Sequence, residues 1–219
     1  MKHPRTWAVG FMVACLTACT GSLFQSKAAP LRVYKLSAAA HPTAAGTPTP
    51  AAPIAASIPV DLAVLKTLTS SGLKTDRIAV LYPDRHLDYF ADARWSGLVG
   101  EVLQDLAVQA FRAHAGLRTV SDDASAFSSA YWLEIEVTDF QAEYMSAGAP
   151  PSVHVHLLAR IGTSDNRRIL GQFAADASQP AAENRLASIV DAYAHATDAA
   201  LAQIVADADA VLTRTSEAR

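Results

Sequence analysis

Two histidines and two glutamates are the residues of this sequence whose spacing best suits metal binding. His154 and His156 lie two positions apart, so both side chains project from one face of a strand. Glu134 and Glu136 have the same spacing in the preceding predicted strand. Imidazole and carboxylate groups that face one another across two strands can bind a transition metal. Two histidines without a closed third and fourth ligand are also typical of a solvated polar face. We favour that interpretation and predict no metal site.

No catalytic motif is present in the sequence. It contains no G-x-S-x-G, no glycine-rich phosphate loop and no H-E-x-x-H. Its serines have no histidine and aspartate at recognisable offsets. We therefore expect a protein that is not an enzyme and that holds no cofactor.

A charged segment that also contains aromatic residues is the best candidate for contact with a partner. It runs from position 84 to position 94, between a predicted strand and a predicted helix. Aromatic residues surrounded by charges are typical of interface centres with polar rims. Two alternatives are a solvated loop, and a segment whose Tyr89 and Arg94 fix the start of the helix internally. The candidate partner-binding residues are Asp84, Arg85, Asp88, Tyr89, Phe90 and Arg94.

Strands with one buried face are predicted in the second half of the chain. Apolar and polar residues alternate over 131–144 and 153–161, and with 168–175 these segments form an antiparallel meander with short turns. Shorter strands are predicted over 31–36, 58–65, 77–82, 86–91 and 117–120.

Two long amphipathic helices are predicted by apolar residues at helical spacing. The first contains Trp95 on its apolar stripe, with Asp92 as its N-cap, and ends near position 115. The second covers 186–212, with Pro180 suited to its first turn. The expected fold is α+β with two layers: a mixed, mostly antiparallel sheet of four to six strands, with both helices packed on one face.

The N-terminus has the layout of a secretory signal. Lys2 and Arg5 precede a short apolar run, which ends in Leu16-Thr17-Ala18-Cys19. This ending resembles a bacterial lipobox, which implies cleavage before Cys19 and acylation of that residue. The expected organisation is a lipoprotein signal peptide over 1–18, a lipidated tether over 19–30, a first short strand with an Ala/Pro-rich linker over 31–57, the α+β domain over 58–214 and a tail over 215–219.

The cysteines, the charge and the residue after Cys19 restrict the possible disulfides, partners and location of the protein. Cys15 would leave with the signal, so Cys19 would be the only thiol and no intramolecular disulfide could form. The chain has 18 Lys+Arg against 21 Asp+Glu, and this mildly acidic, scattered balance argues against a nucleic-acid partner. Thr20 stands after Cys19 where Asp tends to retain lipoproteins in the inner membrane, which favours the outer membrane.

Several segments, taken in order, resemble the ABC-type transport auxiliary lipoprotein family. Tyr34-Lys35-Leu36 resembles a short strand of that family, and Tyr89 followed by Arg94-Trp95 is the closest match. The stretches over 75–80 and 131–144 and the Ala-rich terminal helix also fit.

The resemblance implies a non-catalytic periplasmic domain that the lipid on Cys19 anchors to the outer membrane of a Gram-negative bacterium. It implies an auxiliary role in a mammalian-cell-entry (MCE) type ABC transport system for lipids or other hydrophobic compounds. The implied partners are an MCE-domain protein, its permease and ATPase, and a lipid as candidate cargo. Two alternatives stay open: a metal-binding or enzymatic lipoprotein that uses His154 and His156, and a purely structural envelope lipoprotein.

Overall fold

The computed structural model describes residues 30–37, 58–114, 116–122, 128–146 and 148–217. The chain divides into two units, 1–31 and 32–219, and all the elements below belong to the second unit. The predicted signal peptide, Cys19 and most of the Ala/Pro-rich linker lie outside the described residues.

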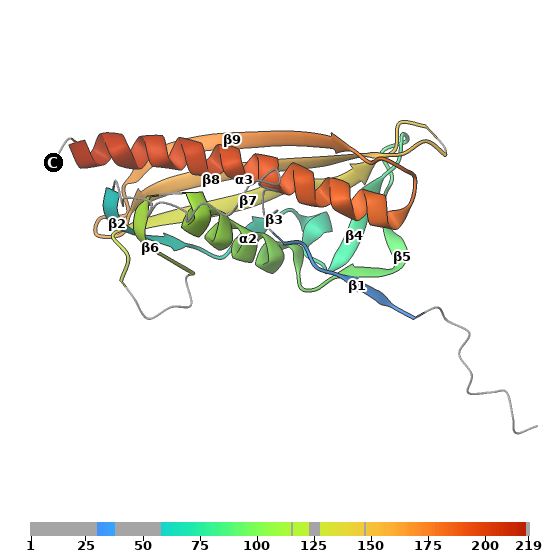
Figure 1. Ribbon diagram of the computed structural model, residues 1–219, viewed down its shortest axis with the longest axis horizontal. Coiled ribbons are helices and arrows are strands. Elements are labelled where there is room, and N and C mark those ends of the chain that lie inside the picture. Colours follow the sequence, from blue (N-terminus) through green and yellow to red (C-terminus); the bar gives the residue numbers. More distant parts are fainter. Residues whose placement is uncertain (1–29, 38–57, 115, 123–127, 147, 218–219) are drawn as a thin grey trace, which may run out of the picture. The chain divides into compact units, whose positions relative to one another are not determined.

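Within the described residues, the second unit is built on one mixed sheet of nine strands (Figure 1). Its strands are β1 Arg32–Tyr34, β2 Ile58–Val64, β3 Leu68–Thr69, β4 Arg77–Leu81, β5 Leu87–Trp95, β6 Leu117–Asp122, β7 Tyr131–Glu143, β8 Ser152–Thr163 and β9 Ile169–Pro180. The predicted meander is confirmed, because β7 pairs with β8 and β8 with β9, both antiparallel.

The long strand β7 organises the rest of the sheet. Along its other edge it pairs in parallel with β2, β3 and β4 in turn. Strand β6 then joins β2, while β5 joins β4 and β1 joins β5. The expectation of four to six strands is therefore wrong. One 13-residue strand aligns three shorter strands end to end in the same sheet, and the two-residue β3 is too short to show periodicity in a sequence.

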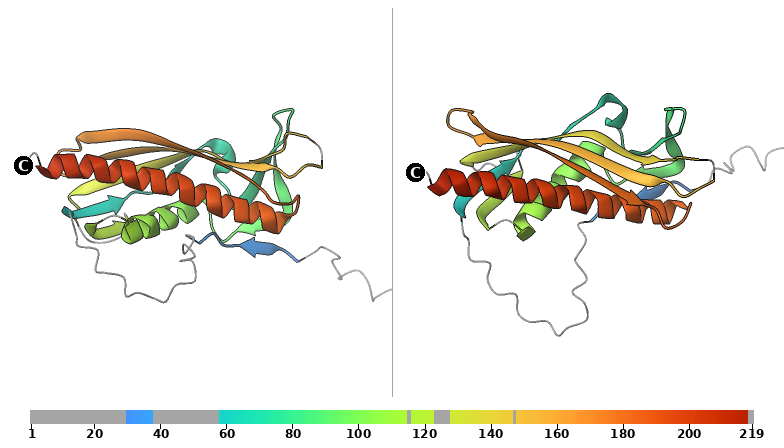
Figure 2. Two further views of the ribbon diagram at one scale, coloured as in Figure 1. Left: turned by 45° about the horizontal axis from the view of Figure 1, so that its top comes forward. Right: turned by 90° about the horizontal axis from the view of Figure 1, so that it is seen from above.

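Both helices lie on the same side of the sheet (Figure 2). Helix α2 spans Val99–His114 and α3 spans Leu186–Glu217. Buried residues recur every three or four positions in α2, from Val99 to Phe111, as a helix with one buried face requires. The buried face of α3 is rich in alanine, which allows the helix to approach the sheet closely. None of the helices in the described ranges combines the length and apolarity needed to cross a membrane.

Alternation along β7 separates the two faces of the sheet. Tyr131, Leu133 and Ile135 are buried beneath the helices, whereas Trp132 and Glu134 lie on the opposite face, which neither α2 nor α3 covers. An irregularity between Val137 and Asp139 shifts this alternation by one residue, so Phe140 and Ala142 continue the core.

The second helix begins at Leu186 as predicted, but the residues expected to cap or open the two helices belong to strands. Strand β5 continues through Asp92 to Trp95, so Asp92 is not an N-cap, and Trp95 ends a strand rather than opening α2. The strand runs on because a bulge absorbs its extra residues opposite β4, with Asp92 at φ 53°. Pro180 ends β9, still paired with β8, and α3 begins six residues later.

Candidate functional site

The tip of the β4–β5 hairpin presents three of the predicted partner-binding residues. Asp84, Arg85 and Asp88 are all exposed. The backbone of Arg85 is left-handed, with φ 64°, and its N–H donates to the Tyr82 carbonyl at 2.8 Å. The carboxylate of Asp84 accepts the backbone N–H of His86 at 3.1 Å. The turn therefore has a defined conformation that directs charged side chains into solvent.

An aromatic row extends from this tip to the end of β7. The ring of Tyr82 stacks on His86 at 5.6 Å and on Tyr144 at 5.7 Å between ring centroids. The Tyr144 hydroxyl donates to the Asn184 side chain at 2.7 Å, just before α3. Burial, with a smaller contribution from Tyr82, raises the pKa of Tyr144. An open pocket of about 480 Å³ at the tip is lined by Tyr82, Pro83, Asp84, His86 and Asp88.

Tyr89, Phe90 and Arg94, the other three predicted residues, lie along β5 and contact the protein itself. The Tyr89 hydroxyl donates to the Gly72 carbonyl at 2.8 Å, and Arg77 lies over the Tyr89 ring at 4.3 Å. Arg94 forms an ion pair with Asp76 at 3.2 Å, and the half-buried Phe90 packs against the core. This geometry favours the alternative in which Tyr89 and Arg94 make contacts within the protein rather than with a partner. They hold strand β5 in place, however, and not the start of a helix.

Three rings beneath this region form the centre of the core. Trp95 meets the edge of Tyr193 at 5.0 Å and a tilted Phe140 at 5.8 Å. The buried Tyr193 hydroxyl donates to the Ala79 carbonyl on β4 at 2.7 Å, and burial raises the pKa of Tyr193 well above its ordinary range. This cluster joins α3 to strands β4, β5 and β7 and so positions the hairpin.

The histidine cluster on the uncovered face differs from the predicted one. His154 Nε2 lies 3.0 Å from Asp176 on β9, and its Nδ1 lies 3.3 Å from Glu143 on β7. His156 Nδ1 lies 2.5 Å from the Thr138 hydroxyl. Partial burial lowers the pKa of His154, but the hydrogen bond to Asp176 and the nearby carboxylates outweigh it, so the pKa is raised.

The predicted glutamates are not the partners of these histidines. Glu134 lies opposite Arg160 and forms an ion pair with it, and Glu136 lies opposite Leu158. The register of β7 against β8 could not be read from the sequence, because of the irregularity after Val137. Within the described ranges, no three His, Cys, Asp or Glu side chains are grouped as metal ligands would be.

A family model described as the ABC-type transport auxiliary lipoprotein component matches residues 34–205. The chain belongs to this family. The resemblance noted in the sequence is thereby confirmed, and the family description makes the chain an auxiliary lipoprotein component of ABC-type transport. No curated protein matches the chain in sequence.

Solved structures support the fold. The crystal structure of protein XCC0632 from Xanthomonas campestris, of the DUF330 family, is 21% identical with a TM-score of 0.70, covering 84% of this chain and 98% of that one. The hypothetical protein CT253 from Chlamydia trachomatis is 12% identical with a TM-score of 0.50, covering 70% of this chain and 98% of that one. At these identities the similarity concerns the fold alone.

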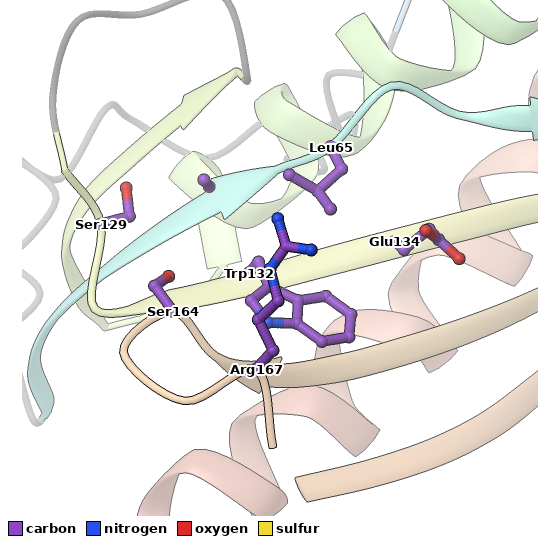
Figure 3. Close-up of a pocket in the computed structure, with 7 residues that line it drawn as sticks. Leu65, Ser129, Trp132, Glu134, Ser164 and Arg167 are labelled. Atoms are coloured by element: carbon purple, nitrogen blue, oxygen red, sulfur yellow. The ribbon is translucent and has the colours of Figure 1, made fainter. Parts of the chain in front are cut away.

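Two candidate surfaces emerge that the sequence only partly indicated. The stacked row of Tyr82, His86 and Tyr144 was not predicted, because the three residues come from separate strand ends that only the register brings together. A second pocket surrounds Trp132 on the uncovered face (Figure 3). A large aromatic residue at a position predicted to face solvent was the signal that could have indicated it.

Proposed function

We propose that this chain is a non-catalytic lipoprotein of the outer membrane that serves an MCE-type ABC transport system for lipids or other hydrophobic compounds. The observation that carries the proposal is the family match over residues 34–205. The lipobox ending at Cys19 supports an acyl anchor, and Thr20 in place of Asp supports the outer membrane.

An auxiliary component without catalytic groups acts by contact, and the hairpin tip is the surface best suited to such contact. Asp84, Arg85 and Asp88 surround exposed aromatic side chains, while the backbone of the turn is fixed by its own hydrogen bonds. A preformed surface of this kind loses little conformational entropy on binding. We therefore assign contact with the MCE-domain partner to the tip, and internal support to Tyr89, Phe90 and Arg94.

The test is co-purification with an MCE-domain protein co-expressed with this chain. A variant carrying Asp84→Asn, Arg85→Gly and Asp88→Asn removes the three charges. It keeps the acceptor oxygens that cap the turn, and glycine suits the left-handed position. The matched control is Asp76→Asn with Arg94→Gln, which removes an exposed ion pair from β5 and the segment before β4. We expect the tip variant to lose the partner and the control to retain it. Equal recovery with both folded variants would exclude the tip as the interface.

Anchoring is tested separately in fractionated cells. Cys19→Ser is expected to release the domain from the membrane, and Thr20→Asp to shift the lipoprotein from the outer to the inner membrane. A Cys19→Ser protein that still sediments with outer membranes would contradict the anchor.

A further inference from the structure

We propose that the pocket around Trp132 and Arg167, on the uncovered face of the sheet, binds the oxyanion head group and first chain segment of a single-chain anionic amphiphile. This inference deepens the proposed function and takes from it the expectation that the cargo is hydrophobic. The pocket has a volume of about 490 Å³, within the range that holds one small ligand. Its lining residues are Ala63, Leu65, Ser129, Trp132, Glu134, Ser164 and Arg167.

The Trp132 indole forms a fixed apolar wall in this pocket. Its Nε1–H donates to the Thr163 carbonyl at 3.0 Å, so the polar end of the ring is already satisfied. A Cβ on Gly162 would lie 2.4 Å from the indole Cζ2, so only glycine lets the ring lie so close to β8. Ala63 and Leu65 from the β2 region continue the apolar lining. An acyl chain would therefore meet a preformed surface.

The charge of the pocket comes from Arg167. Glu134, the acid in the lining, is paired with Arg160. The guanidinium of Arg167 has no hydrogen bond or ion pair to any residue in the described part of the chain. Figure 3 shows its side chain extending from the β8–β9 turn into the pocket beside Trp132. A planar guanidinium binds carboxylates and phosphates through two parallel hydrogen bonds.

The turn that carries Arg167 is rigid and strained. The Thr163 hydroxyl donates to Asn166 at 2.6 Å, and the Thr163 backbone N–H donates to the Arg168 carbonyl at 2.9 Å. Arg167 itself has φ 53°, a left-handed conformation that costs free energy in any residue with a side chain. Glycine or asparagine would be the favoured residue at this position, so an arginine there indicates a role for the side chain.

The residues that line the pocket determine which class of ligand it can bind. The Arg167 guanidinium and the Ser129 and Ser164 hydroxyls suit an oxyanion, while the indole and the aliphatic residues suit the adjoining hydrocarbon. The head group is therefore the carboxylate of a fatty acid or the phosphate of a lysophospholipid. A neutral amphiphile lacks the group that Arg167 binds, and inorganic phosphate lacks the group that Trp132 binds.

The test uses the full chain held in amphipol and follows tryptophan fluorescence during titration with brominated stearate. We expect saturable quenching, which Trp132→Phe removes. Arg167→Gln is expected to weaken binding roughly tenfold or more, since a charge-assisted bidentate contact is lost. Arg168→Gln is the matched control, because it removes the neighbouring arginine, which does not line the pocket. Brominated stearyl alcohol is expected to bind much more weakly, and competition by lysophosphatidic acid or by unbrominated stearate identifies the preferred head group.

Arg167→Gly separates a ligand-binding role from a structural one. Glycine relieves the left-handed strain, so we expect the melting temperature of the Arg167→Gly variant to be no lower than that of the wild type. We expect the same variant to lose binding of brominated stearate. Equal affinity of Arg167→Gln and Arg168→Gln, or equal affinity for the alcohol and the acid, would overturn the proposal. The variants at Arg167 and Arg168 leave the hairpin tip unchanged. Co-purification of the Arg167→Gln variant with the MCE-domain protein therefore tests the proposed function independently of this pocket.

Discussion

Trp95 holds together the elements on which the hairpin depends, and its removal should show this directly. Only 1% of the residue is exposed, and its ring contacts both Phe140 and Tyr193. Truncation of a large buried aromatic residue costs about 3–5 kcal/mol through lost burial and the cavity that remains. Each ring pair adds about 0.5–1.5 kcal/mol beyond burial, so we expect Trp95→Ala at the upper end of that range. For a chain of this size the melting temperature should fall by roughly 10–20 °C.

Trp95→Phe tests the contribution of the buried indole nitrogen. The Trp95 indole Nε1 is buried and has no hydrogen-bond partner among the described residues. Phenylalanine keeps a ring in the cluster and removes this unpaired donor, which offsets part of the lost volume. We expect its cost to be less than half that of Trp95→Ala, measured by urea unfolding monitored with circular dichroism. Equal destabilisation by both substitutions would show that the indole nitrogen has a partner, and an unchanged melting curve for Trp95→Ala would refute the core assignment.

Three further predictions concern single contacts. Gly162→Ala should destabilise the fold by about 1–3 kcal/mol in urea unfolding, because the new Cβ would overlap the Trp132 ring, and an unchanged midpoint would refute that contact. Tyr193→Phe should cost about 1–2 kcal/mol in the same assay, since a buried carbonyl on β4 loses its donor. The raised pKa of His154 means that its contact with Asp176 stabilises the fold fully below about pH 6.5, and that this contribution is lost as the pH rises through the folded pKa. The difference in unfolding free energy between wild type and His154→Gln should therefore be larger at pH 5.5 than at pH 9, and a difference independent of pH would contradict this.

The long elements of the fold could be predicted from the sequence because each carries its own periodicity. The alternation over 131–144 and the apolar stripe of α3 depend only on which face of one element is buried. The parallel pairings of β2, β3 and β4 with β7 could not be predicted in this way. They depend on where the intervening segments return to the sheet, and β3 has only two residues.

Trp95 illustrates a prediction that was right for a partly wrong reason. Its burial was expected from its place on an apolar stripe that continues into α2. The residue is buried, but at the end of β5, because a bulge keeps the strand going through Asp92. A helical repeat read across a strand end cannot distinguish the two cases. Similarly, the alternation of His154 and His156 was correct, but their acidic partners depend on a register that an irregularity in β7 shifts.

The two candidate surfaces lie at opposite ends of β7, and this separation makes their roles distinguishable. Trp132 is the second residue of the strand, whereas Tyr144 follows its last residue and stacks on Tyr82 of the hairpin. A strand rises about 3.3 Å per residue, so the two ends are about 40 Å apart. Substitutions at such distant sites without shared contacts are expected to act additively. A variant that combines Arg167→Gln with the neutralised hairpin tip should therefore show the two separate losses, of amphiphile binding and of MCE co-purification, and each loss should equal that of its parent variant. If the combined variant lost more amphiphile binding or more MCE co-purification than the corresponding parent variant, β7 would have to transmit a conformational change between its ends.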